Sequence, residues 1–361
     1  MTRRFVPFGR DWRMGIEVPY SLAVLDHGCL WSCGQCPLDR DARVLFPGKL
    51  RNQLELIAGR IGDELARCGL APDRLGKLVA YAAMDAATPL DAVEPMLRKS
   101  LKPVPLVLTI GVPQFYYPGM MVEIDVHGAT DGPPTAETHR PHHGAQASVV
   151  AFGGIVHLRL VLDPGADLSR LRGLVQDLLK GFEASLDAVV SAHLFLAADA
   201  AATARTETAT AVLGADPGAA VLAMLPHGAA AVVDIIAEAG ATGSTGLVVS
   251  NGVSLVERRA GKALGLAARW TGPQQPPAAA TRCIMEVLSH RLAAHGFRFA
   301  DVVKQQTYYV GAASEKDLHA NMTIRNAYYA RPGPASTGLA VHGFLDPNCR
   351  ITVEVLASRR S

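Results

Sequence analysis

The sequence lacks a long apolar run, an excess of charge of either sign and a cysteine framework. No apolar stretch approaches the ~20 residues that a membrane-spanning helix needs. The 35 basic and 33 acidic residues nearly cancel, leaving a net charge of +2, so charge gives no reason to expect a nucleic acid or an anionic membrane as partner. Six cysteines in 361 residues are too few for a disulfide scaffold. We therefore expect a globular protein whose partner is a small molecule.

The amino terminus lacks the hydrophobic core of a secretory signal. Arg3 and Arg4 are followed only by the short segment Phe5-Val6-Pro7-Phe8 before glycine and charged residues resume. Reduced thiols also suit the cytoplasm. The sequence therefore predicts a cytoplasmic protein.

A unit that occurs three times is the clearest positive feature of the chain. An acid between β-branched or apolar residues closes a predicted strand at Glu123, at Asp234 and at Glu354. These acids lie roughly 110–120 residues apart, a period longer than that of solenoid repeats. Such a period suits three small domains, each large enough for its own core.

Hydrophobic periodicity gives each unit the same order of elements, ββαβαβ. This order predicts a helix-backed mixed sheet and hence an α+β fold. We expect unit 1 over residues 1–128, a linker over 129–145, a divergent unit 2 over 146–240 and unit 3 over 241–361. The first strand of unit 3 is predicted over residues 247–258.

Short motifs in units 1 and 3 follow one family pattern. In unit 1 they are Val18-Pro19-Tyr20-Ser21-Leu22-Ala23-Val24, Cys33-Gly34-Gln35-Cys36-Pro37-Leu38-Asp39, Ile110-Gly111-Val112-Pro113 and Tyr117-Pro118-Gly119-Met120-Met121-Val122-Glu123-Ile124. In unit 3 they are Asp301-Val302-Val303, Pro334-Ala335-Ser336-Thr337 and Val353-Glu354-Val355. Together they resemble the RidA (YjgF) family of enamine/imine deaminases, and unit 2 matches in element order.

The resemblance implies an architecture. Members of that family have a chorismate-mutase-like fold and form homotrimers with clefts between subunits. Three units in one chain therefore imply a single-chain pseudo-trimer with up to three clefts. Whether such pseudo-trimers associate further stays open.

The resemblance also implies catalytic residues. The family's opening tyrosine is Tyr20, its serine before Gly-Gln is Cys33, and its closing-strand glutamate falls on Glu123, Asp234 and Glu354. Hydrolysis of a C=N bond needs an oriented water and an acid for the leaving nitrogen, and a half-buried carboxylate can do either. We therefore expect Glu123 or Glu354 to orient the water, with Tyr20 and Cys33 lining the cleft.

The family's substrate-clamping arginine is missing, because Val107 and Ser336 occupy the matching positions. Side chains two residues apart on a strand share a face. This alternation brings Arg159 or Arg269 toward a cleft, where a guanidinium would suit a carboxylate. On corresponding strand faces we expect Trp31, His157 and Thr271 to line the substrate site as well.

The sequence thus predicts a hydrolytic deaminase of an enamine or imine, with no cofactor and no metal. A carboxylate-bearing substrate is expected, and an aminomuconate-type dicarboxylate from aromatic-ring catabolism is one candidate. The alternatives are a ring-opening amidohydrolase of the cyanuric acid hydrolase or barbiturase type, for which Ser250-Asn251-Gly252 is a weak signal, a chorismatase-like enzyme, and a binding protein with decayed clefts.

Cys29, Cys33 and Cys36 also have the Cys-x3-Cys-x2-Cys spacing of a radical-SAM iron–sulfur motif. The residue before the last cysteine is Gln35, where that motif usually has an aromatic residue. We expect buried or pocket-lining thiols without iron.

Overall fold

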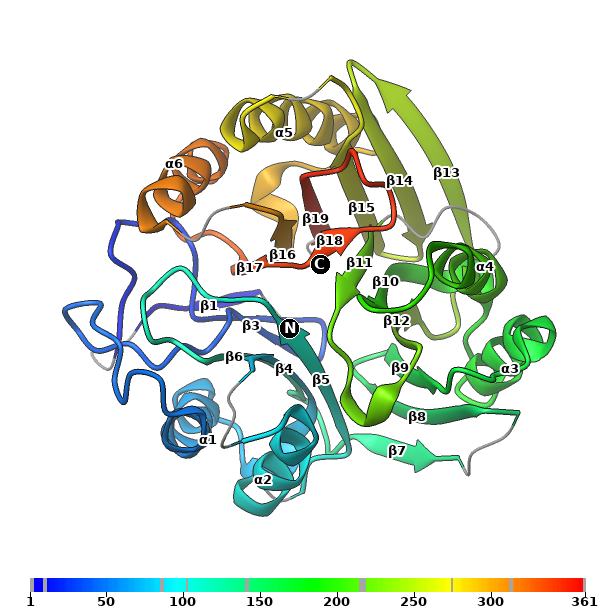
Figure 1. The fold of residues 1–361 in the computed structure, drawn as a ribbon, viewed down its shortest axis with the longest axis horizontal. Coiled ribbons are helices and arrows are strands. Elements are labelled where there is room, and N and C mark those ends of the chain that lie inside the picture. The colour runs from blue at the N-terminus through cyan, green and yellow to red at the C-terminus, as the bar shows by residue number, and fades with distance from the viewer. Residues whose placement is uncertain are drawn as a thin grey trace.

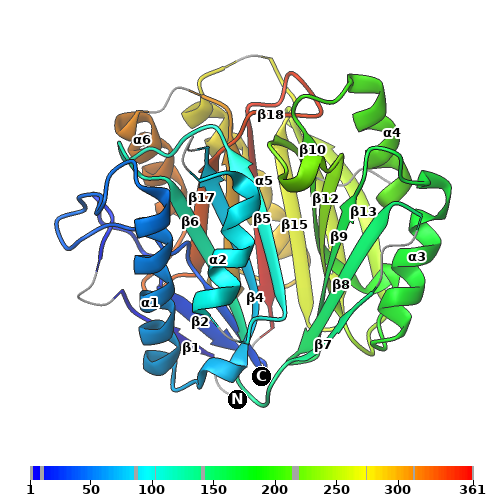
Figure 2. The same ribbon diagram turned by 60° about the horizontal axis from the view of Figure 1, so that its bottom comes forward.

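The computed structural model describes residues 3–8, 12–84, 88–101, 103–139, 143–213, 219–273, 275–311 and 314–359. These residues form three mixed sheets around a central axis, and each sheet carries two α-helices on its outer face (Figure 1, Figure 2). The three-unit α+β architecture predicted from the sequence is confirmed. No helix in the described part of the chain is both long and apolar enough to span a membrane.

The sheet of unit 1 has the strand order β1-β2-β3-β6-β4-β5. The bounds are β1 Arg4–Val6, β2 Ala23–Asp26, β3 Cys29–Ser32, α1 Leu50–Cys68, β4 Leu75–Ala83, α2 Val93–Ser100, β5 Leu106–Val112 and β6 Val122–Ala129. Helix α1 forms because apolar residues recur at helical spacing from Leu50 to Leu65 and are buried against the sheet. It ends at Gly69, whose φ of 74° is the left-handed conformation that favours glycine.

The sheet of unit 2 has the order β18-β11-β10-β12-β9-β8-β7. The bounds are β7 Thr135–Thr138, β8 Ala145–Phe152, β9 Ile155–Leu162, α3 Leu168–Lys180, β10 Val189–Ala197, α4 Ala202–Leu213, β11 Ala219–Ala223 and β12 Ala231–Glu238. Strand β18, Gly343–Phe344, comes from unit 3 and pairs with β11, so the chain crosses between units here.

The sheet of unit 3 has the order β13-β14-β15-β19-β16-β17. The bounds are β13 Gly243–Ser250, β14 Val253–Ala260, β15 Ala263–Trp270, α5 Pro277–Ala294, β16 Val302–Tyr309, α6 Glu315–Asn326, β17 Ala335–Ala340 and β19 Ile351–Ser358. One apolar core gathers the inner faces of the sheets, and further cores lie between the sheets of units 1 and 2 and their helices.

Two predicted segments differ from the structure. The linker over 129–145 contains strand β7, which pairs with β8 through Thr138↔Ser148 and the pairs beside it. The strand predicted over 247–258 is a hairpin of β13 and β14. It turns at Asn251 and Gly252, whose φ values of 50° and 73° allow the two-residue connection that an Asn-Gly pair favours.

The strand register corrects the repeat of acids. Each unit has an irregularity next to one position, and these positions are Lys77, Ser191 and Lys304. Two residues after these positions come Val79, His193 and Gln306. Their partners on the closing strands are Asp125, Asp234 and Glu354, respectively. Glu123 therefore corresponds to Val232 and Thr352. The prediction that Asp234 and Glu354 are its counterparts was wrong, because these acids lie two residues further along their strands than the position of Glu123.

Candidate active site between units 1 and 3

A small cavity lies at the seam between units 1 and 3. Unit 1 contributes Tyr20, Cys33 and Glu123, and unit 3 contributes Arg325 from α6 and Ser336 from β17. Backbone hydrogen bonds close the seam beside it: Ser21 donates to the Pro334 carbonyl at 3.0 Å and Gly333 donates to the Pro19 carbonyl at 2.7 Å. Tyr20, Cys33 and Glu123, which the sequence predicted for the unit 1 side of a cleft, thus line one cavity.

Glu123 is the titratable acid that the cavity buries. It is 8% exposed, and burial, followed by the neighbouring Asp125 carboxylate, raises its pKa to about 8. A methyl group on Gly34 would lie 1.7 Å from Glu123 Oε1, so the glycine after Cys33 is what admits the carboxyl group. At neutral pH the group is therefore mostly protonated, as an acid for a leaving nitrogen should be.

Tyr20 and Cys33 flank this carboxyl group. The Tyr20 hydroxyl accepts a hydrogen bond from Gln305 Nε2 at 3.3 Å, which ties it to unit 3. Burial, with Glu64 as the next cause, raises the pKa of Cys33 well above its usual value. The thiol is consequently neutral, which suits a wall of the cavity and not a nucleophile.

Arg325 brings a buried positive charge to the cavity. It is 1% exposed, its Nε donates to Asn321 Oδ1 at 2.8 Å and its Nη1 donates to Thr307 Oγ1 at 3.0 Å. Both partners are neutral, and no ion pair joins Arg325 to a carboxylate within the described ranges. A buried guanidinium without a counter-ion is costly unless an anion binds it.

The remaining walls are apolar. They come mainly from the amino-terminal segment, from the loop after β5 and from α6: Phe8, Trp12, Met14, Val18, Phe115, Tyr116, Tyr117, Met120, Leu318 and Met322. The cavity measures about 60 Å³. This arrangement places one acid and one guanidinium among apolar side chains, where electrostatic interactions are stronger than in water.

The seam between units 2 and 1 is built differently. Arg159 of β9 reaches across it, placing Nη1 3.2 Å from Glu94 Oε2 and donating a hydrogen bond to the Val107 carbonyl. Unit 2 has Val232 where unit 1 has Glu123. Arg159 thus joins the two units there, and the structure does not bring it to the cavity with Glu123.

The other predicted residues also lie outside that cavity. Arg269 lies on β15 opposite Thr352, on unit 3. Thr271 donates to the Gly252 carbonyl at 3.3 Å at the end of the β13–β14 hairpin. Trp31 and His157 have ring centroids 5.9 Å apart in the central core, and Trp31 lines a different cavity on the axis.

Glu354 also belongs to the axis. Its Oε2 lies 2.7 Å from His193 Nε2 of unit 2, and Glu354 lines the axial cavity, not the cavity with Glu123. Of the two glutamates predicted for catalysis, Glu123 therefore lies at the seam between units 1 and 3, and Glu354 lies on the axis.

The three cysteines of the Cys-x3-Cys-x2-Cys spacing point to different places. Cys29 contacts the carbonyls of Phe152 and Gly153 at 3.7 and 3.9 Å, whereas Cys33 and Cys36 line the cavity with Glu123. Within the described ranges no group of His, Cys, Asp or Glu could hold a metal ion. Ser250, the weak signal for a ring-opening amidohydrolase, is exposed on the β13–β14 hairpin.

Comparison with solved structures matches the chain one unit at a time. A Rid-family protein, YyfA, from Yersinia pestis is 20% identical, with 36% of this chain and 99% of that chain covered and a TM-score of 0.30. A Mycobacterium tuberculosis member of the YjgF/YER057c/UK114 family is 19% identical, with 36% and 100% covered and a TM-score of 0.27. A Neisseria meningitidis YjgF-family protein is 17% identical, with 37% and 98% covered and a TM-score of 0.27.

The chain thus resembles the RidA (YjgF) family. No protein-family model matches it, and no curated protein does. Because each match spans about a third of the chain, the three-unit architecture rests on the strand order of the sheets themselves.

Within this RidA-like chain, sequence reasoning missed Arg325. Its signal was the spacing of Leu318, Met322 and Arg325, which puts the arginine on the apolar face of α6. An arginine on the buried face of an amphipathic helix needs an explanation, and no motif around it supplied one.

Proposed function

We propose that the cavity between units 1 and 3 hydrolyses a small imine or enamine that bears one carboxylate. The observation that carries the proposal is that Glu123, with its raised pKa, and Arg325, whose guanidinium meets no carboxylate of the described residues, line the same largely apolar cavity. The acid supplies proton transfer and the guanidinium supplies an anchor for a carboxylate.

The reaction consumes water and releases ammonia. Glu123, protonated at neutral pH, donates its proton to the imine nitrogen, and the resulting carboxylate orients a water for attack on the imine carbon. The carbinolamine that forms then loses ammonia and leaves a carbonyl, while the proton taken from the water restores Glu123. For an enamine, the first proton goes to carbon and gives the same imine. No step requires an oxidant or a reductant.

The cavity favours a small monocarboxylate. Among the described residues that line it, Arg325 is the one guanidinium, and most of the others are apolar or aromatic. Within the described part of the chain, a second carboxylate, as in an aminomuconate-type dicarboxylate, would meet no further cation in this cavity. Substrate carboxylate on Arg325 would place the adjacent imine carbon toward Glu123, with the side chain among Trp12 and Phe115.

Activity is tested by ammonia release from imino acids that an amino-acid oxidase produces in the assay. We expect small aliphatic 2-imino monocarboxylates to be hydrolysed faster than in the absence of the protein. Imino dicarboxylates made from aspartate or glutamate should be hydrolysed more slowly. Equal rates with and without the protein for every member of the series would refute the proposal.

Replacing Arg325 by methionine is expected to raise KM about 10–100-fold, because a charge-assisted hydrogen bond to a carboxylate is worth about 1.5–3 kcal/mol. The same change removes a buried charge, which offsets the hydrogen bonds lost to Asn321 and Thr307, so the variant should stay folded. Arg159→Met is the matched control. It removes a buried arginine from another seam, and KM should stay at the wild-type value. An unchanged KM in Arg325→Met would show that the carboxylate binds elsewhere.

A further inference from the structure

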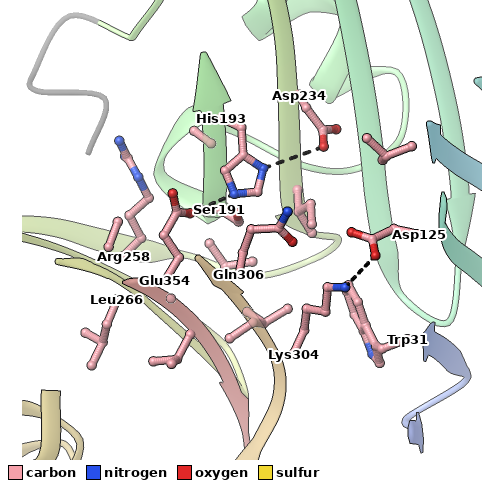
Figure 3. Close-up of a pocket in the computed structure, with 18 of the residues that line it drawn as sticks. Trp31, Asp125, Ser191, His193, Asp234, Arg258, Leu266, Lys304, Gln306 and Glu354 are labelled. Carbon is pink, nitrogen blue, oxygen red and sulfur yellow. Dashed lines mark hydrogen bonds and ion pairs between the residues drawn. The ribbon is translucent and has the colours of Figure 1, made fainter. Parts of the chain in front are cut away.

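A cluster of charged residues lies on the central axis, apart from the cavity with Glu123. Each unit contributes one acid at the same strand position, Asp125, Asp234 and Glu354, and these side chains converge with Lys304 and His193 (Figure 3). All three acids are at most 7% exposed. Buried charges of this kind must be paired, so their partners can be counted.

Two of the acids are paired with a lysine from the preceding unit. Lys304 of unit 3 lies 2.9 Å from Asp125 of unit 1, and Lys77 of unit 1 lies 2.6 Å from both oxygens of Asp234 of unit 2. Lys77 and Lys304 occupy equivalent positions in their units. In both pairs the lysine of one unit meets the acid of the next unit around the axis. By the same rule, the residue of unit 2 at the lysine position would pair with Glu354 of unit 3.

Unit 2 has Ser191 at that position. His193 binds only one oxygen of Glu354, with Nε2 2.7 Å from Oε2, and Ser191 lies beside this contact (Figure 3). Glu354 Oε1 is buried and accepts no hydrogen bond from any described residue. The third pair therefore lacks the ammonium group that the other two have.

A cavity of about 50 Å³ lies at this point, enough for an ion or molecule of a few heavy atoms. It is lined by Ser191 and Glu354, and the small residues Gly265 and Ala267 face it as well. Gly265 leaves no room for a larger side chain, because an added methyl group would lie 1.7 Å from the Val190 carbonyl oxygen.

A larger opening of about 390 Å³ lies beside this cavity. The two share Trp31, Val190 and Leu356. Acidic side chains at this opening include Asp131 and Glu238, against the cation Lys262. A net negative mouth raises the local concentration of small cations.

We propose that the axial cavity binds a small ammonium ion, either NH4+ or a primary ammonium as small as methylammonium. Its N–H groups would donate to Glu354 Oε1 and complete the third acid–ammonium pair. The lysine pairs of the other two units show the chemistry that this position accepts. Binding requires no catalytic activity of the protein, so the inference is independent of the proposed function.

The cations around Glu354 set the pH dependence of binding. The charged and titratable groups that line the cavity with His193 are Glu354, Asp234, Asp125, Lys77, Lys304, Arg258, Tyr81 and His127, and Tyr308 packs against its ring. Burial lowers the pKa of His193, but Glu354 and Asp234 outweigh burial and raise it to about 10. A second cation on Glu354 would lower that pKa, so binding should release protons and be tighter at about pH 8 than at about pH 6.

Thermal unfolding of the full chain in ammonium chloride and in methylammonium chloride tests the proposal. Potassium chloride and tetramethylammonium chloride at equal ionic strength are the controls, because neither cation has an N–H group. We expect a saturable rise in Tm of a few degrees with ammonium, with methylammonium or with both, and the responding salt identifies the source. An equal response to all four salts, or no response to any, would overturn the proposal and leave water as the occupant.

Variants place the effect on the axis. Glu354→Gln should remove the response to ammonium, and Ser191→Lys should remove it because its own ammonium fills the cavity. Glu257→Gln is the matched control, since Glu257 is a buried glutamate of unit 3 that pairs with Arg291 and His295 away from the axis. It should respond as wild type does, and so should Glu123→Gln. A full response in Glu354→Gln would overturn the assignment even if Ser191→Lys fails to fold.

Discussion

Replacing Glu123 by glutamine is expected to lower kcat for ammonia release by about 10²–10⁴-fold. Glutamine keeps the shape of the side chain, but it can neither donate the proton that the imine nitrogen needs nor become the carboxylate that orients the water. KM should change little, because the substrate carboxylate binds Arg325.

The Glu123→Gln variant is expected to become more stable than the wild-type protein as pH rises. In the unfolded chain a glutamate has a pKa of about 4.3, whereas in the folded protein the pKa of Glu123 is about 8. Between these values the folded state holds a proton that the unfolded state has lost, so the wild-type protein loses stability with rising pH across this window. Glutamine does not titrate, so the free energy of unfolding of Glu123→Gln should exceed that of wild type by a margin that grows toward pH 8.

Glu64→Gln is the matched control for both measurements. Glu64 on α1 is 2% exposed, burial raises its pKa to about 8, and it lies outside the cavity. Its replacement should give the same gain in stability with wild-type kcat. A wild-type kcat in Glu123→Gln would show that Glu123 has only a structural role, and a parallel loss of kcat in both variants would point to a general effect of buried charge.

The second large effect concerns the axis. Asp234→Asn is expected to lower the free energy of unfolding by about 3–5 kcal/mol, the cost of leaving a buried charge without its partner. Lys77 is 1% exposed and both of its contacts to Asp234 measure 2.6 Å, so its ammonium group is left buried without its nearest counter-ion once the carboxylate is gone. Chemical denaturation of wild type and variant measures the difference.

The double variant Lys77→Met, Asp234→Leu is the control, because it removes both charges and fills the space with apolar atoms. It should recover most of the lost stability. If the free energy of unfolding of Asp234→Asn lies within about 1 kcal/mol of the wild-type value, the Lys77–Asp234 pair contributes no more than an exposed salt bridge. The charges on the axis then do not hold the units together.

The pH dependence of stability gives a second check on the axis. Burial raises the pKa of Asp234, but Lys77 outweighs burial and holds it well below the usual value, so its contribution is present above about pH 3.9 and is lost as pH falls. The raised pKa of His193 gives a contribution that is present below about pH 6.5 and is lost as pH rises through about 10. Both pH-dependent contributions to the free energy of unfolding should be absent from a variant that lacks Asp234 and Glu354.

The sequence predicted the elements well where the pattern was local. Helix α1 and the strands β4 and β16 follow from apolar spacing. The family resemblance, and not local spacing, predicted that Tyr20, Cys33 and Glu123 line a cleft. What the sequence could not place was register. The equivalent irregularities beside Lys77, Ser191 and Lys304 fix which residues of the closing strands correspond, and they match Asp125, not Glu123, with Asp234 and Glu354.

Contacts between units were also beyond reach of the sequence. Arg159 has the strand position expected of a residue facing a cleft, but the acid that pairs with it, Glu94, is on a helix of another unit. Arg325 belongs to the cavity because α6 of unit 3 packs against the amino-terminal segment of unit 1. Such neighbours are set by how three sheets close around an axis, which no spacing within one unit encodes.

A crystal structure with 2-oxobutyrate, a 2-oxo acid of the kind that hydrolysis of a 2-imino monocarboxylate releases, would test the central claim most directly. The claim is that one of the seams between units, that of units 1 and 3, is the working site. We predict the ligand's carboxylate on the Arg325 guanidinium and its carbonyl carbon facing Glu123. Binding at the seam with Arg159, beside Arg269 or on the axis, with none at Arg325, would contradict it.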